Sequence, residues 1–157
     1  MTELDSLRLA VTSTMHKVGR HWRRLVQDVT ATHGISEACA QPLIIIGRLG
    51  EGVRQGVVAE EVGIEGPSLV RLLDQLCAGD LVERRDDAAD RRAKTLWLTA
   101  RGRRTTQRIE RELVALRTRV LADVSREDLE AALRVFRAFD AAVGRGAEAA
   151  AMAEAAL

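Results

Sequence analysis

The sequence predicts a mainly α-helical protein with a small β-wing. Three observations support this fold class: a helix with one apolar face over 66–79, a charged hairpin directly after it, and long amphipathic segments near both ends of the chain. A short helix, a polar-faced helix and a charged hairpin in this order are typical of a winged helix-turn-helix. We therefore expect a winged helix-turn-helix whose N- and C-terminal helices form a dimerisation region.

Length and composition agree with one folded domain. The chain has 157 residues, of which 46% are hydrophobic and only 3% aromatic, so the core should be aliphatic. No signal peptide, lipidation motif or apolar run of 18 residues occurs in it, and we expect a soluble, cytoplasmic protein. Two cysteines, Cys39 and Cys77, do not favour a disulfide framework in a chain of this size.

The first amphipathic segment covers residues 4–29. Its apolar residues are spaced by threes and fours: Leu4, Leu7, Val11, Val18, Trp22, Leu25 and Val29. A helix of this length is roughly 40 Å long, which is more than a small winged-helix domain can cover. The surplus apolar face predicts a dimer, and the alternative is a long helix packed within the monomer.

The next two helices should belong to the helix-turn-helix lobe. Ser36 is expected to cap a helix whose Leu-Ile-Ile-Ile run at 43–46 is apolar on all sides, so this helix should be nearly enveloped. Gly50-Glu51-Gly52 interrupts the chain. The apolar residues of 57–62 then predict a short first helix of the helix-turn-helix, with Gly63 at the turn.

The segment 66–79 predicts the recognition helix. Pro67 suits the first helical turn because its φ is already fixed and its missing N–H is not needed there. One apolar stripe follows at i, i+3, i+4 and i+7, formed by Leu69, Leu72, Leu73 and Leu76. We expect Gly79 to end this helix in the left-handed conformation.

The opposite face of that helix carries Ser68, Arg71 and Gln75. Arg can bond guanine O6 and N7, and Gln can bond adenine N6 and N7, from a helix in the major groove. These residues are therefore candidates for reading bases. The alternative is a face that only contacts solvent, because a helix that buries a leucine stripe carries polar residues on its opposite side in any case.

A basic hairpin follows the recognition helix. Short β-favouring runs at 81–82 and 96–98 flank a loop rich in Asp and Arg, and residues 84–104 carry a net charge of +5 in a protein of net charge +1. Thr99 should cap a further helix with apolar residues at helical spacing from 106 to 120. Ser125 and Asp128 resemble a capping box before a last helix over 129–143, and the Ala-rich tail after Gly144 should be frayed helix or a mobile end.

The stretch GIEGPSLVRLLDQLCAGDLVERR, followed by DRRAKTLWLTARG, resembles the DNA-binding core of MarR-family transcription regulators, especially the SlyA-like branch. The resemblance is strong over 57–104. It implies sequence-specific binding of double-stranded DNA by a homodimer on a pseudo-palindromic operator, as a repressor or an activator. The expected organisation is dimerisation helices at 1–34 and 122–157, a winged helix-turn-helix lobe at 36–104 and a linking helix at 105–121.

The resemblance also implies roles for the wing. Asp90 would hold Arg92, and Arg92 would enter the minor groove, whose negative potential attracts a guanidinium. The expected DNA-binding residues are Pro67, Ser68, Arg71, Gln75, Asp90, Arg91, Arg92 and Lys94. The alternatives are a wing of solvated charges without a ligand, and a dimeric helical adaptor that binds protein through its winged helix.

An effector is a further expectation. Regulators that this chain resembles often bind small aromatic anions where the dimer helices meet the DNA-binding lobes. Trp22, on the apolar stripe beside Arg20, Arg23 and Arg24, could stack on such a ring and pair its carboxylate. The alternative is that Trp22 fills the dimer core while the arginines are solvated.

Catalytic and metal sites find little support in the sequence. His16 and His21 are five residues apart rather than at the i, i+4 spacing of a helical metal pair, and no phosphate loop, nucleophile elbow or Cys-x-x-Cys is present. We expect no enzyme activity, metal or cofactor. Cys39 should be a buried thiol, and oxidant sensing by Cys77 is the less favoured alternative because the chain has no Tyr to activate it.

Overall fold

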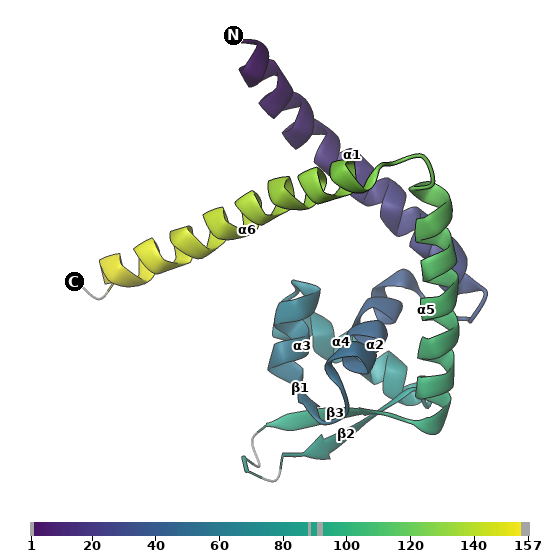
Figure 1. Ribbon diagram of the computed structural model, residues 1–157. Coiled ribbons are helices and arrows are strands. Elements are labelled where there is room, and N and C mark those ends of the chain that lie inside the picture. The colour runs from purple at the N-terminus through teal and green to yellow at the C-terminus, as the bar shows by residue number, and fades with distance from the viewer. Residues whose placement is uncertain (1, 88, 91–92, 155–157) are drawn as a thin grey trace. The chain divides into compact units, whose positions relative to one another are not determined.

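The computed structural model describes residues 2–87, 89–90 and 93–154, and the side chains up to residue 143 except those of 88, 91 and 92. The elements are α1 (Glu3–Ala31), α2 (Glu37–Leu49), β1 (Val53–Arg54), α3 (Gln55–Val62), α4 (Gly66–Ala78), β2 (Val82–Asp86), β3 (Lys94–Leu98), α5 (Ala100–Val120) and α6 (Arg126–Glu154) (Figure 1). The predicted fold class, mainly helical with a small β-wing, is confirmed. The chain divides into two units, Met1–Leu116 and Arg117–Leu157.

Side-chain caps begin the first two helices. The Thr2 hydroxyl accepts the N–H of Asp5 at 3.1 Å, and the Asp5 carboxylate accepts the N–H of Thr2 at the same distance, which forms a capping box. The Ser36 hydroxyl accepts the N–H of Cys39 at 3.3 Å and caps α2, as expected. Gly63 ends α3 with φ 73°, a left-handed turn that glycine adopts without strain.

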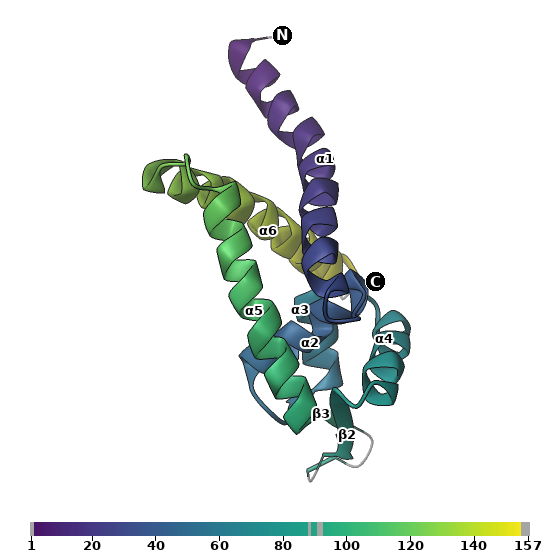
Figure 2. The ribbon, with the colours of Figure 1, turned by 90° about the vertical axis from the view of Figure 1, so that its right-hand side faces the viewer.

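The core of the first unit lies around α2, which is placed between α4 and α5 (Figure 2). Leu43 and Ile46 are completely buried, and Ile45 is half-buried, so the expected envelopment of this helix is nearly complete. Three leucines of the predicted α4 stripe are buried, while Leu72 is only half-buried. The C-terminal half of α1 packs against this core through Trp22, Leu25, Val26 and Val29.

The sheet is antiparallel with strand order β1-β3-β2. In β2 and β3, Val82 pairs with Leu98 and Asp86 with Lys94, so both strands are longer than the short runs predicted. The two-residue strand β1 was not predicted, and it pairs Val53 with Leu96. These two residues are too few for a periodic signal in the sequence.

The prediction that Gly79 ends α4 in the left-handed conformation is wrong. Gly79 has φ −81°, and Asp80 takes the left-handed position with φ 53°. The N–H of Leu81 donates to the carbonyl of Leu76 at 2.9 Å, and the N–H of Asp80 donates to the carbonyl of Cys77 at 3.0 Å. These two bonds form a Schellman motif whose left-handed residue is Asp80, one position later than expected.

The start of α5 is fixed against the end of α4. The Thr99 hydroxyl accepts the N–H of Gly102 at 2.9 Å, which confirms Thr99 as a cap, and it donates to the carbonyl of Asp80 at 2.7 Å. A Cβ added at Gly102 would lie 1.9 Å from the carbonyl oxygen of Leu81. Only glycine permits this approach of the two backbones.

The second unit contains α6. The Ser125 hydroxyl accepts the N–H of Asp128 at 3.1 Å and donates to the Asp128 carboxylate at 2.7 Å, so Ser125 caps this helix through its side chain. The helix continues to Glu154, which favours the helical alternative for the Ala-rich tail. None of its described side chains up to residue 143 is buried.

Candidate nucleic-acid interface

The exposed face of α4 carries the residues expected to read bases. Pro67 lies in the first turn of the helix, and the side chains of Ser68, Arg71 and Gln75 all face solvent while Leu69 and Leu73 on the opposite side are buried. In the part of the chain that the structure describes, Arg71 makes no ion pair. Its guanidinium is therefore available to an external partner.

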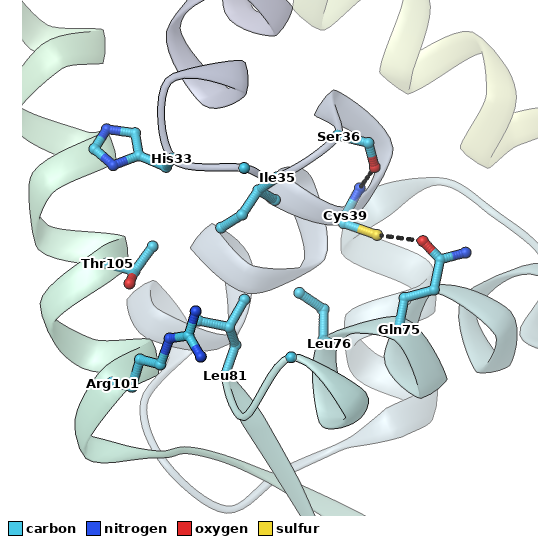
Figure 3. Close-up of a pocket in the computed structure, with 11 residues that line it drawn as sticks. His33, Ile35, Ser36, Cys39, Gln75, Leu76, Leu81, Arg101 and Thr105 are labelled. Atoms are coloured by element: carbon cyan, nitrogen blue, oxygen red, sulfur yellow. Dashed lines mark hydrogen bonds between the residues drawn. The ribbon is translucent and has the colours of Figure 1, made fainter.

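Gln75 differs from the other two because it already has a contact. The Sγ of Cys39 donates to the Gln75 side-chain oxygen at 3.2 Å, so α4 is joined to α2 at this point (Figure 3). Cys39 is buried, as expected. A base contact by the Gln75 oxygen would require this hydrogen bond to break.

Arg84 connects the helix to the wing. Its Nη1 donates to the Asp74 carboxylate at 2.6 Å and its Nη2 donates to the carbonyl of Val70 at 3.0 Å. Both acceptors lie on α4, whereas Arg84 lies on β2. In the sequence Arg84 is only one residue of a basic run, and its separation of ten residues from Asp74 offers no periodic signal.

Asp87 organises the turn at the end of β2. Its carboxylate accepts the N–H of Ala89 at 2.8 Å and that of Asp90 at 3.3 Å, and it pairs with Arg54 at 2.7 Å. These bonds, of which that from Ala89 is the largest influence, lower the pKa of Asp87 from its usual value. The wing is thus attached to β1 by a carboxylate that sequence analysis did not single out.

The expected wing residues fall into two groups. Asp90 and Lys94 are described and exposed, and Lys94 pairs with the carboxylate of Asp86, its partner across the hairpin. Arg91 and Arg92 lie outside the described residues, and so does the expected contact between Asp90 and Arg92.

The second tryptophan supports the wing. The guanidinium of Arg85 lies 4.2 Å from the centre of the Trp97 ring, a cation–π contact. Trp97 also approaches Gly52, where an added Cβ would be 3.0 Å from the ring. Trp97 therefore packs between β2 and the turn before β1.

Acidic residues also lie near α4. Glu60 and Glu61 on α3 and Glu65 at the N-cap of α4 are exposed. Their negative charge lowers the attraction for phosphate at this end of the helix, so any attraction for a nucleic acid would depend on basic residues of α4, the wing and α5.

The residues expected to bind an aromatic acid are spread around α1. Trp22 is half-buried against the core, whereas Arg20, Arg23 and Arg24 are exposed. Residues one and two positions apart on a helix do not face each other, so the arginines and the indole project in different directions.

A cavity of about 350 Å³ lies close to Cys39 and Gln75 (Figure 3). It is lined by the turn between α1 and α2, the end of α4 and the start of α5: His33, Gly34, Ile35, Ser36, Cys39, Gln75, Leu76, Gly79, Leu81, Arg101 and Thr105. This cavity could not be predicted from the sequence, because its walls come from segments that lie far apart in the chain.

The described residues contain no group of three or more His, Cys, Asp or Glu side chains placed to hold a metal ion. The helices of the described part are too short or too polar to cross a membrane. Burial raises the pKa of the Cys77 thiol, so this cysteine stays protonated at neutral pH, which weakens the alternative of oxidant sensing.

Comparison with known proteins finds one family model that matches part of the chain and several structures of similar fold. A model of the MarR family matches residues 33–93. The structure of the transcriptional regulator PA3341 is 29% identical, with a TM-score of 0.79 over 86% of this chain and 98% of the other.

Two further similar structures come from Staphylococcus aureus. MarR in complex with salicylate and kanamycin is 18% identical, with a TM-score of 0.78 over 91% of this chain and 96% of the other. MepR in a DNA complex is 17% identical, with a TM-score of 0.76 over 83% of this chain and 96% of the other.

Proposed function

We propose that this chain is a MarR-family transcription regulator that binds double-stranded DNA as a homodimer, placing α4 in the major groove and the wing beside it. The family model covers 33–93, which includes α2, α3, α4 and most of the wing. The MepR structure contains DNA, and it has the same fold as this chain.

The observation that carries this proposal is the exposed polar face of α4 next to a basic hairpin. Arg71 is exposed and unpaired among the described residues, and Arg84 joins α4 to β2 through Asp74. Arg84 thus fixes the position of the wing relative to α4. A fixed position is required if α4 is to enter the major groove while the wing reaches the neighbouring minor groove.

Dimerisation is inferred from apolar side chains of α1 and α6 that are exposed to solvent in the single chain. In α1, Leu4, Leu7, Val11 and Val18 are exposed, and α6 exposes Leu129, Leu133, Phe136, Phe139 and Val143. Exposed apolar stripes of this size mark interaction surfaces. A two-fold dimer would bury them and place its half-sites about one helical turn, near 10 base pairs, apart.

The direct test is selection of bound sequences from random duplexes, followed by binding of the selected duplex at increasing salt. A DNA-binding dimer should enrich a pseudo-palindrome, and its affinity should fall steeply with salt because bound phosphates release counterions. The adaptor alternative predicts no enriched sequence and little retention on duplex DNA.

The contacts can be separated by substitution. Arg92→Ala should weaken binding by roughly 1–3 kcal/mol per half-site, and Asp90→Ala should do less damage because Asp90 would only orient the arginine. Arg71→Ala should instead relax the base preference within each half-site. Unchanged affinity of Arg92→Ala at moderate salt would show that the wing is not a DNA element.

We further propose that a small aromatic anion regulates DNA binding by stacking on Trp22. Because Arg20, Arg23 and Arg24 project from α1 in other directions, the group that pairs the anion's carboxylate would have to come from another element. S. aureus MarR, which shares the fold, was crystallised with salicylate. In a Trp97→Phe background, salicylate should quench Trp22 fluorescence and weaken DNA binding over the same concentration range, by about 1–3 kcal/mol at saturation. Absence of any response across a panel of aromatic acids would refute this effector.

A further inference from the structure

Arg71 and Gln75 are neighbours on the exposed face of α4. They lie four residues apart, so their side chains project from the same side of the helix, and both residues are exposed. Arg71 carries only hydrogen-bond donors, because a guanidinium has no acceptor. A glutamine amide carries an acceptor oxygen and two N–H donors, so the orientation of the Gln75 amide decides what this part of the face presents.

The Gln75 oxygen is held by α2. The Sγ of Cys39 donates to the Oε1 of Gln75 at 3.2 Å. In Figure 3 the Gln75 oxygen points toward Cys39, and the amide nitrogen points away from it. Among the described residues, none accepts a hydrogen bond from that nitrogen. The two N–H groups are therefore the part of the Gln75 amide that is left for an external partner.

The thiol belongs to the core of the lobe rather than to its surface. Cys39 lies buried in the first turn of α2, and its backbone N–H is bound by the Ser36 hydroxyl. A reversed Gln75 amide would turn its N–H groups toward the Cys39 sulfur, which is only a weak acceptor. The observed orientation uses the stronger acceptor, oxygen.

Base edges differ in what they offer to such an amide. In the major groove guanine presents two adjacent acceptors, O6 and N7, whereas adenine presents the N7 acceptor beside the N6 amino group. A free glutamine amide matches adenine, because it supplies one acceptor and one donor. An amide whose oxygen is already bonded can only donate, so it matches guanine and opposes the amino group of adenine.

We propose that Cys39 is a positioning residue that sets the base preference of Gln75 to guanine rather than adenine. A buried thiol does not touch the duplex, so it acts only through the Gln75 oxygen. The reading face then presents donors alone at Arg71 and Gln75, and each half-site carries guanine at both of the bases that they contact. This inference rests on the proposed function, because it requires α4 in the major groove.

The test begins with selection of bound sequences from random duplexes, using the parent protein and Gln75→Ala. The position whose preference is lost in Gln75→Ala is the base that Gln75 reads, and the parent should select guanine there. Adenine at that position, or no position that depends on Gln75, would overturn the inference. If the parent enriches no sequence at all, the proposed function itself fails and the base preference fails with it.

Cysteine variants then test the positioning role. Cys39→Ala frees the Gln75 oxygen, so the preference for guanine over adenine at that one position should fall about two- to tenfold, the weight of one ordinary hydrogen bond. Cys39→Ser keeps a donor and should keep guanine. An unchanged preference in Cys39→Ala would overturn the inference. Equal loss in Cys39→Ala and Cys39→Ser would also overturn it, because packing rather than the donor would then be responsible.

Cys77→Ala is the matched control. Cys77 is the half-buried thiol of α4 itself, and it makes no side-chain hydrogen bond in the part of the chain that the structure describes. This variant should select the same sequences as the parent. The same loss of guanine in Cys77→Ala and Cys39→Ala would show a general effect of thiol removal and overturn the inference.

A measurement without DNA tests the hydrogen bond separately from base selection. In NMR relaxation of the free protein, the Gln75 side-chain amide should be more mobile in Cys39→Ala than in the parent or in Cys39→Ser. Unchanged relaxation of the core amides of α2 would show that the lobe is still folded. A Gln75 amide that is equally mobile in the parent and in Cys39→Ala would overturn the positioning role, whatever sequences the two proteins select.

Discussion

The winged-helix lobe and the terminal helices differ in how far their apolar side chains are buried. In the lobe, Leu43, Ile46 and Leu69 are completely buried within one chain. On α6, by itself, Leu133 is 50% exposed and Phe136 is 52% exposed, and on the first half of α1 Leu7 is 60% exposed. All of these residues recur at the same helical spacing, so periodicity alone does not reveal which face one chain can cover.

The difference agrees with the proposed dimer, in which only the terminal helices meet a second chain. The lobe buries its own core and can present α4 and the wing without help. The terminal helices carry stripes that a second copy would bury, and a two-fold arrangement would bury the same residues on both chains. Predictions that change one region and leave the other intact therefore test this account.

The largest effect should follow truncation in the lobe. Leu43→Ala should lower the free energy of unfolding by about 2–5 kcal/mol, because it leaves a cavity at a position with no exposed surface. Denaturant titration at high protein concentration measures it. The matched change on the other region, Leu133→Ala, should lower the dimer's resistance to dilution and leave the lobe's cooperative unfolding in place.

A smaller loss of stability should follow from a steric clash between two backbone segments. Gly102→Ala would place a Cβ 1.9 Å from the Leu81 carbonyl oxygen, and separating α5 from the end of α4 should cost about 1–3 kcal/mol. Gly56→Ala is the control, because a Cβ there meets nothing within 4 Å and alanine favours the helix. Equal thermal stability of the two variants would contradict the packing described for α5.

The smallest effect concerns the wing, which is held by polar contacts rather than by the core. The pKa of Asp87 in the folded protein is lowered by the Ala89 N–H and by Arg54, so the unfolded chain takes up the proton first as pH falls. The stabilising contribution of Asp87 is complete above the ordinary pKa of an aspartate and is lost as the pH falls through the lower pKa of the folded protein. Hydrogen exchange at the Ala89 amide should therefore lose protection in acid relative to the core.

Asp87→Asn should remove that pH dependence, because the amide cannot gain the proton. Protection of the Ala89 amide that changes equally with pH in parent and variant would show that another group orders the turn. The core amides of α2 provide the internal reference in both proteins.

Much of the lobe could be predicted from the sequence because its signals are local. Ser36 begins α2 and Thr99 begins α5, each through a hydrogen bond to an N–H three residues along the chain. The leucines of α4 recur at helical spacing, which places them on one side of the helix. The exposed face of Ser68 and Arg71 followed from the same periodicity.

The contacts that join distant segments could not be predicted. The bonds from Arg84 to Asp74, from Arg54 to Asp87 and from Cys39 to Gln75 depend on how helices and strands pack in three dimensions. The cavity beside Cys39 and Gln75 arises for the same reason. The error at Gly79 is different: a Schellman motif places its left-handed residue by hydrogen bonds, and Asp80 can adopt that conformation although glycine prefers it.

One measurement tests the central claim most directly: sedimentation of the protein alone and with its selected duplex, at micromolar concentration. A dimer whose terminal helices cover each other should sediment as two chains in both samples, with two chains on one duplex that carries half-sites near 10 base pairs apart. A monomer that binds the duplex with full affinity would contradict the account.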